Sequence, residues 1–213
     1  MRWLGHACFE ITGGGITVVT DPHDGSSLGL PPPRASADVV LISHSHFDHA
    51  DGRGMVSKPG AVVIDKPGLH EAKGLRVKGV LSHHDDAGGS KRGQNVIFTF
   101  ELEGIKFCHL GDLGHVLAPS QVAEIGEVDV LLTPVGGTFT IDASAASRVV
   151  EQLKPKVVVP MHFKVPGLKL PISGVEPFLK GKKSVERLDK SEVELKKEEL
   201  PAETKVVVLS PPK

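Results

Sequence analysis

The sequence predicts an α/β (α+β) fold in which two β-sheets pack face to face and helices cover their outer faces. Short runs of β-branched and aromatic residues recur along the chain and gather at both ends. Segments with helical periodicity interrupt the second half. No strict repeat or low-complexity linker divides the 213 residues, so we expect one domain over residues 1–213.

The first half of the chain is predicted to be mostly strands. Residues 2–12 (RWLGHACFEIT) and 16–22 (ITVVTDP) predict a hairpin around a glycine turn. Residues 24–37 are rich in proline and glycine and predict a loop. Residues 38–43 (DVVLIS) form an unbroken apolar run, which is typical of a strand buried on both faces. Further strands are predicted at 61–65, 75–82, 95–104, 105–112, 128–134 and 156–162.

The predicted helices lie between the later strands. Residues 119–126 and 142–153 have helical periodicity, and Asp142 is placed to cap the second of these helices. A third helix is predicted at 174–181, before strands at 184–188 and 204–210. The charge-rich residues between those two strands alternate in sign and predict a solvated connection.

Composition limits the class of protein. Hydrophobic residues make up 39% and charged residues 24% of the chain, and the net charge of −1 offers no surplus for nucleic acid or anionic membranes. No apolar run approaches the ~20 residues that cross a bilayer, and the N-terminus lacks the apolar core of a signal peptide. Cys8 and Cys108 are too few for a disulfide framework, so we expect a cytoplasmic protein.

Histidine is unusually frequent, with 11 residues, and part of this excess falls in the segment LISHSHFDHAD. His44, His46, Asp48 and His49 follow directly after a predicted buried strand, where a rigid sheet can present functional side chains. A polar loop with scattered histidines is the alternative interpretation. The His-x-His-x-Asp-His spacing at a strand end argues against it and predicts metal ligands.

These four side chains are too few to fill two coordination shells, so further ligands must come from elsewhere. Other histidines and aspartates lie where later predicted strands end, and those ends can open at the same edge of the sandwich. These candidates are His83, His84, His109, Asp112, His115 and His162.

The motifs resemble those of the metallo-β-lactamase-fold superfamily of metal-dependent hydrolases. The resemblance rests on SHSHFDH, a later histidine, GD and PMH, in this order. WLGHACFEI, TDP, HLGDLGH, LLTPVGGTFTID and VVVPMHF are similar to a compact subgroup that includes the ascorbate-6-phosphate lactonase-like proteins. The resemblance covers residues 2–166 and implies the four-layer αβ/βα sandwich of the metallo-β-lactamase fold.

The resemblance also implies a ligand set for two divalent metal ions. His44, His46 and His84 would form the first site, and Asp48, His49 and His162 the second, with Asp112 bridging both ions. We prefer His84 to His83 because the subgroup pattern continues with His-Asp from the ligand onward, and His83 stays the alternative.

The ligand types bear on the identity of the metal. Iron-dependent, oxygen-reducing members of the superfamily carry glutamate where this chain has His46. Five imidazoles and two carboxylates favour Zn²⁺, and Mn²⁺ or Fe²⁺ stay open as alternatives.

Two divalent ions held close together lower the pKa of a shared water toward ~7. The expected reaction is therefore hydrolysis of an ester, lactone, thioester, amide or phosphoester by a metal-bridging hydroxide. Asp48 and Asp112 have expected catalytic roles, as ligands that also orient the water. Other side chains are expected to support the ligands or line the pocket, each with a structural role as the alternative. They are His6, Asp21, His83, Asp85, His109, Thr138 and Thr140.

Two other functions are alternatives to a small-molecule hydrolase. A nuclease or phosphodiesterase acting on nucleic acid is disfavoured, because the gaps between motifs are short and no basic stripe with interleaved aromatics is present. A non-catalytic metal-binding protein is disfavoured, because a structural site is typically closed by four ligands. We expect a small-molecule substrate and neither a membrane nor a nucleic-acid partner, and the sequence sets no oligomeric state.

Overall fold

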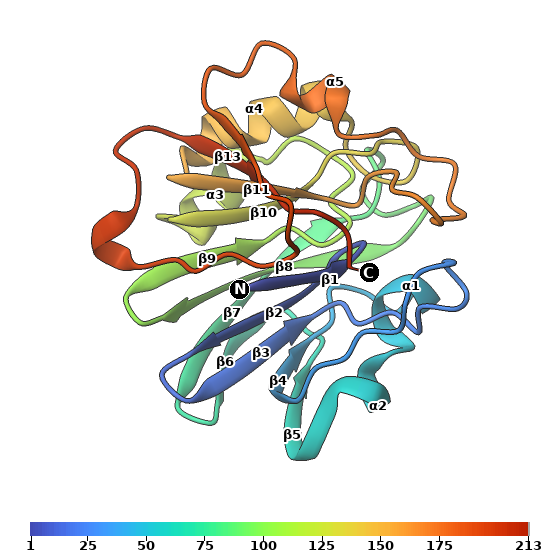
Figure 1. Cartoon of the computed structure of the whole chain (residues 1–213), viewed down its shortest axis with the longest axis vertical. Helices are drawn as coiled ribbons and strands as arrows, with labels where there is room; N and C mark the ends of the chain where they lie inside the picture. The colour runs from blue at the N-terminus through green and yellow to red at the C-terminus, as the bar shows by residue number, and fades with distance from the viewer. Residues whose placement is uncertain (213) are drawn as a thin grey trace.

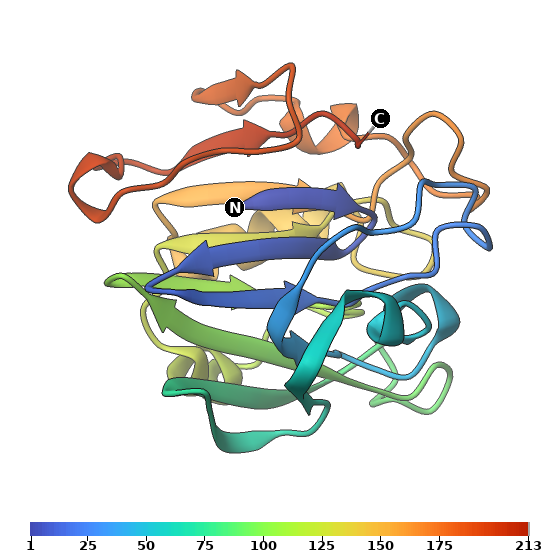
Figure 2. The same cartoon turned by 60° about the horizontal axis from the view of Figure 1, so that its bottom comes forward.

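The chain forms two mixed sheets that pack face to face (Figures 1 and 2) in a computed structural model that describes residues 1–212. The first sheet has the strand order β1-β2-β3-β4-β5, and the second β12-β13-β11-β10-β9-β8-β7-β6. The first comprises β1 (Arg2–Gly5), β2 (Cys8–Gly13), β3 (Ile16–Thr20), β4 (Ala37–Leu41) and β5 (Ser57–Ile64). The second comprises β6 (Gly68–Ala72), β7 (Leu75–His83), β8 (Gln94–Leu102), β9 (Ile105–His109), β10 (Val130–Pro134), β11 (Val157–Met161), β12 (Val185–Arg187) and β13 (Lys205–Val208).

Helices complete the outer layers on both sides (Figure 1). Two single-turn helices, α1 (Phe47–Ala50) and α2 (Arg53–Val56), place Ala50 and Val56 in a small apolar cluster with residues of the first sheet. On the other side, α3 (Pro119–Ile125) packs on β7, α4 (Ala143–Leu153) on β10, and α5 (Glu176–Leu179) on α4. This arrangement confirms the predicted sandwich of two sheets with helices outside.

The largest hydrophobic cluster joins the two sheets. Its fully buried members include Trp3 and Phe9 from the first sheet and Phe98 and Leu131 from the second. Burying one such side chain contributes about 1.5–3 kcal/mol, so the packing of the two sheets stabilises the scaffold behind the loops. All residues of the parallel pair β10 and β11 are buried, which explains their unbroken apolar sequences.

The second predicted helix is confirmed in detail. The carboxylate of Asp142 accepts the backbone N–H of Ala145 at 2.8 Å and caps α4, which ends at Leu153. The elements that were not predicted include α1, α2, β6 and a 3₁₀ helix at Lys197–Glu199. In addition, residues 2–12, predicted as one strand, form the two antiparallel strands β1 and β2. The helices α1 and α2 are single turns, too short to show helical periodicity. Strand β6 has the sequence GLHEA, and its Leu69 is 81% exposed, so no buried face marks it as a strand.

The direction of the strands determines where the site forms. Strands β3, β4 and β5 are parallel, and β7, β9, β10 and β11 run in one common direction in the second sheet. The loops that follow these strands meet at one edge of the sandwich, beside α1 (Figure 1). Within residues 1–212, no helix has the length and hydropathy that crossing a membrane requires.

Candidate metal centre

Histidine and aspartate side chains from several strand ends converge at this edge. His44 and His46 follow β4, and α1 presents Asp48 and His49. His84, Asp112 and His162 come from the loops after β7, β9 and β11. These residues, which the resemblance implies as ligands, thus reach the same place from separate parts of the chain.

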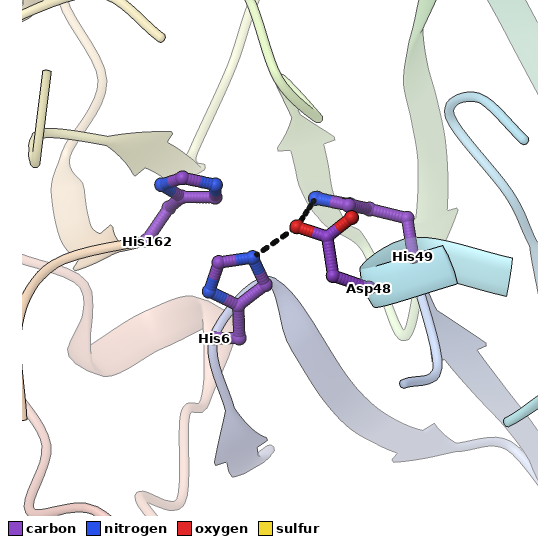
Figure 3. Close-up of side chains that lie close together, drawn as sticks. All are labelled: His6, Asp48, His49 and His162. Atoms are coloured by element: carbon purple, nitrogen blue, oxygen red, sulfur yellow. Dashed lines mark hydrogen bonds and ion pairs between the residues drawn. The ribbon is translucent and has the colours of Figure 1, made fainter. Parts of the chain in front are cut away.

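Three sets of side chains each bring one ligand atom per residue within 4.8 Å of one another. The first set is His44, His46 and His84. The second set is His6, Asp48, His49 and His162, which point toward one another in Figure 3. The third is His44, His49 and Asp112. Together the sets include all seven residues of the implied ligand set, and His6 in addition.

Asp112 lies between the first and second sets. Its Oδ2 is 3.3 Å from His84 Nε2 and also 3.3 Å from His162 Nε2, while its Oδ1 is 3.2 Å from His49 Nε2. Two ligand atoms bound tetrahedrally to one Zn²⁺ at its usual bond lengths are about 3.3 Å apart. The spacing of these atoms therefore fits a carboxylate shared by two ions.

Buried polar atoms in the cluster also fit a metal site. Within residues 1–212, His49 Nε2, Asp112 Oδ1 and His162 Nε2 are buried and make no hydrogen bond of acceptable geometry. Buried polar atoms are normally paired, so an unpaired group of ligand-type atoms needs an explanation. Coordination of divalent cations provides one, and the residues present fit such ions.

One carboxylate orients side chains of both the first and the second set. Asp21 Oδ2 accepts the Nδ1–H of His49 at 2.8 Å. Ser43 donates its backbone N–H and its hydroxyl to Asp21, each at 2.7 Å. The Ser43 Oγ lies 3.0 Å from His44 Nδ1 and can accept a hydrogen bond from the Nδ1–H group. In both histidines Nε2 is then left to face the cluster, which is the usual arrangement for metal-binding imidazoles.

Asp112 is held in place by a buried asparagine. Its backbone N–H donates to Asn95 Oδ1 at 2.9 Å, and Asn95 Nδ2 donates to the carbonyl of Leu110 at 2.9 Å. Gly111 has φ +56°, and a Cβ there would lie 2.4 Å from both Asn95 and Ser43. Only glycine fits this turn. Neither Asn95 nor Ser43 was predicted, because a single polar residue beside a strand forms no recognisable sequence pattern.

Backbone strain concentrates at the same site. His6, Asp21 and His162 all have positive φ, at 53°, 38° and 50°. Non-glycine residues rarely adopt this region, and they persist there only where the surrounding structure imposes it, often at functional sites.

The electrostatic environment favours neutral imidazoles at some positions and a charged one at another. Burial, with repulsion from His49, lowers the pKa of His44 to about 3. Burial also acts to lower the pKa of His49, but Asp112, Asp21 and Asp48 outweigh it and raise that pKa well above 6.5. Burial by itself raises the pKa of Asp112, yet His162 and His49 hold it well below its usual value. Without metal, His49 thus carries a proton among ionised carboxylates.

His84, and not His83, faces the cluster. Strand β7 ends at His83, whose ring lies 5.7 Å from that of His115 and whose backbone N–H donates to His115 Nε2 at 3.2 Å. The ring of His84 is buried, with its centroid 4.7 Å from that of His44. This geometry agrees with the preference for His84.

Other residues that were predicted to lie near the pocket form hydrogen bonds with backbone groups outside the cluster. The Asp85 carboxylate does not pair with His84: it accepts the backbone N–H groups of Ala87, Gly89, Lys91 and Arg92 at 2.8–2.9 Å, which outweigh burial and lower its pKa. It thereby fixes the loop that follows His84. His109 is buried with both ring nitrogens paired, Nε2 to the Ala7 carbonyl and Nδ1 to the Gly111 N–H.

The two threonines of the GGTFT loop also pair with backbone. Thr138 donates its hydroxyl to the Pro171 carbonyl at 3.0 Å, and Thr140 to the Ile141 carbonyl at 3.1 Å. The loop itself reaches the cluster through Gly136, where a Cβ would lie 2.2 Å from the carbonyl oxygen of His162. These threonines therefore shape the loop and leave metal contact to other residues.

A two-sheet sandwich with a His/Asp cluster at its strand ends, together with the relatives below, identifies the chain as a metal-dependent hydrolase of the metallo-β-lactamase superfamily. The family described as the beta-lactamase superfamily domain matches residues 1–162, and the chain belongs to this family. This match confirms the resemblance to the metallo-β-lactamase-fold superfamily and the predicted fold. The predicted enzyme class is confirmed by relatives named as metal-dependent hydrolases, while the lactonase-like subgroup stays a prediction.

Curated relatives agree with this assignment. A UPF0173 metal-dependent hydrolase from Thermococcus onnurineus is 31% identical over 188 residues, covering 76% of this chain and 84% of the relative. A UPF0173 metal-dependent hydrolase from Thermoplasma acidophilum is 29% identical over 184 residues, covering 76% and 81%.

A solved structure shares the fold over almost the full chain. It is a candidate Zn-dependent hydrolase of the metallo-β-lactamase superfamily from Thermotoga maritima, with 46% identity and a TM-score of 0.80. The match covers 98% of this chain and 96% of that protein.

Proposed function

We propose that residues 1–213 form one hydrolase domain with a dinuclear centre, most readily filled by Zn²⁺, that cleaves an ester, lactone or phosphoester bond in a small molecule. One observation carries the proposal. The Asp112 carboxylate lies within 3.3 Å of nitrogens in both the first and the second set, so it can serve two ions at once.

The proposed ligands are those of the implied set. His44, His46 and His84 would hold one ion, Asp48, His49 and His162 the other, and Asp112 would contact both. Imidazole and carboxylate suit zinc, a borderline cation, and also suit Mn²⁺ or Fe²⁺. The Thermotoga maritima relative, named as a candidate Zn-dependent hydrolase, supports zinc.

When bound, the pair of ions supplies an activated water and polarises the scissile bond. The protein supplies position and charge. Asp48 and Asp112 stay ionised, because neighbouring histidines lower both pKa values against the effect of burial. As acceptors they orient the attacking water toward the substrate.

Exposure indicates the side from which substrate enters. His46 is exposed, whereas His49 and His162 are 0% exposed. The substrate therefore approaches over the first set, beside Phe47, which is 47% exposed. A phosphorylated sugar lactone is our leading substrate class, since the sequence motifs are similar to the lactonase-like subgroup.

Metal analysis combined with a substrate panel tests the proposal. The purified protein is assayed for metal content and for turnover of sugar lactones, p-nitrophenyl esters, bis-p-nitrophenyl phosphate, RNA and DNA, before and after chelation. We expect two ions per chain, and turnover that chelation abolishes and Zn²⁺ restores. Two ions without turnover would favour a non-catalytic metal-binding protein, and faster cleavage of RNA or DNA would favour a nuclease.

A further inference from the structure

We propose that His6 is a positioning residue of the metal centre, whose Nε2–H fixes the Asp48 carboxylate as a ligand of the second ion. This inference rests on the proposed dinuclear function. It concerns an imidazole that lies outside the implied ligand set.

The contacts of His6 are directed at two proposed ligands. Its Nε2 lies 3.1 Å from Asp48 Oδ2 (Figure 3), and its ring centroid is 4.0 Å from that of His162. His6 is only 1% exposed. A buried imidazole that pairs with one ligand and packs on another restricts the position of both.

The direction of the hydrogen bond follows from the chemistry of the partner. An ionised carboxylate can only accept, so the proton of the neutral imidazole must lie on Nε2. The remaining lone pair is then on Nδ1, which is buried and makes no hydrogen bond within residues 1–212. With its proton toward Asp48, Nε2 has no lone pair for an ion. Through Nε2, His6 therefore acts as a donor to a proposed ligand.

The backbone of His6 reinforces the same part of the site. Its carbonyl accepts the Trp3 Nε1–H at 3.0 Å and the His162 backbone N–H at 3.2 Å. Its φ of 53° is a conformation that glycine adopts with less strain. The turn alone would thus be served better by glycine, and the imidazole has a role that the turn does not explain.

Substitutions can separate the hydrogen bond from general packing. His6→Leu removes the donor while keeping an apolar side chain, and His6→Gln retains an N–H donor at nearly the reach of Nε2. His23 provides a matched control, since it is 0% exposed and its Nε2 pairs with the Leu4 carbonyl at 3.2 Å, outside the three ligand sets. His23→Leu and His23→Gln therefore accompany the His6 variants.

The readout is Zn²⁺ affinity, measured by competition with a chromophoric chelator, together with the absorption spectrum of the Co²⁺-loaded protein. His6→Leu is expected to weaken binding of the second ion about 10- to 100-fold, the usual effect of losing a hydrogen bond to a metal ligand. Binding of the first ion should stay within about twofold of the parent. His6→Gln should restore most of the loss, with an unchanged Co²⁺ spectrum, and the His23 variants should bind both ions normally.

Each other outcome overturns the inference in a distinguishable way. Two ions bound normally by His6→Leu would remove the role of His6 and leave the proposed function intact. Equal losses in both His6 variants, with an altered Co²⁺ spectrum, would show that His6 is a ligand. A parent protein that binds fewer than two ions would refute the dinuclear centre, and this inference with it. If His6→Leu does not fold, His6→Gly, which relieves the positive φ, takes its place in the same comparison.

Discussion

Asp21 accepts the Nδ1–H of His49 at 2.8 Å, and both side chains are almost completely buried. Through the hydroxyl of Ser43, the same carboxylate also reaches His44. One aspartate that is no proposed ligand therefore orients an imidazole in the first set and another in the second.

Replacing Asp21 should weaken both metal sites. In Asp21→Asn the side chain keeps its shape but loses the charge that balances His49, so we expect Zn²⁺ affinity to fall about 10- to 100-fold. Chelator competition measures this affinity. Asp24→Asn is the control, because Asp24 accepts hydrogen bonds from the nearby surface residues Ser26 and Ser27 and lies outside the three ligand sets. Unchanged affinity in Asp21→Asn would show that the network does not support the ligands.

Removing the Asp112 carboxylate should reduce metal binding more than replacing Asp21 does. Asp112→Ala takes away the group that contacts both sets, and we expect loss of at least one ion and a fall in kcat/KM of roughly 10³-fold or more. Metal content and steady-state kinetics measure the two effects. A variant with two ions and near-normal turnover would show that Asp112 does not bridge.

Replacing His84 should reduce metal binding and activity far more than replacing the adjacent His83. His84→Ala removes a ring whose Nε2 is 3.3 Å from Asp112 Oδ2, whereas His83→Ala removes one that lies beside His115. We expect His84→Ala to lose metal and activity and His83→Ala to retain most of both. The reverse order would make His83 the ligand.

Metal binding should release a proton near neutral pH. The pKa of His49 lies well above 6.5, because three carboxylates outweigh burial, so the metal-free protein holds a proton that an ion must displace. Zn²⁺ affinity should therefore rise with pH, up to tenfold per unit for one proton, until the pH passes the raised pKa. Calorimetry in buffers of different ionisation enthalpy counts the protons. A pH-independent affinity between pH 6 and 8 would contradict this assignment.

The same pKa has the opposite consequence for the metal-free fold. A raised pKa stabilises the folded state fully below the unfolded value of about 6.5. This contribution is lost as the pH rises through the raised value. Without metal, the protonated His49 should thus stabilise the fold more at neutral than at alkaline pH. A bound ion displaces this proton, so the stability of the metal-loaded protein should instead rise with pH.

Much of the architecture and the approximate position of the site could be predicted from the sequence. The unbroken apolar run before His44 predicted a buried strand, and parallel strands place the ligand-bearing loops at one edge. The short helix that carries Asp48 and His49 could not be predicted, because a single turn depends on its surroundings more than on its own sequence.

The residues that support the candidate ligands were harder to predict than the candidate ligands themselves. Ser43 and Asn95 act through tertiary contacts that only the folded chain creates. Asp85 was expected to support the ligands or line the pocket, but its carboxylate accepts hydrogen bonds from backbone N–H groups of its own loop. The spacing of histidines and aspartates along the chain shows that they gather near a strand end. It does not determine which atoms each side chain contacts.

The most direct test of the dinuclear centre is an anomalous-scattering map from Zn²⁺-loaded crystals, collected on both sides of the zinc absorption edge. We expect two peaks, one among His44, His46 and His84 and one among Asp48, His49 and His162, each within bonding distance of Asp112. A single peak, or two peaks that Asp112 does not contact, would contradict the proposed dinuclear centre.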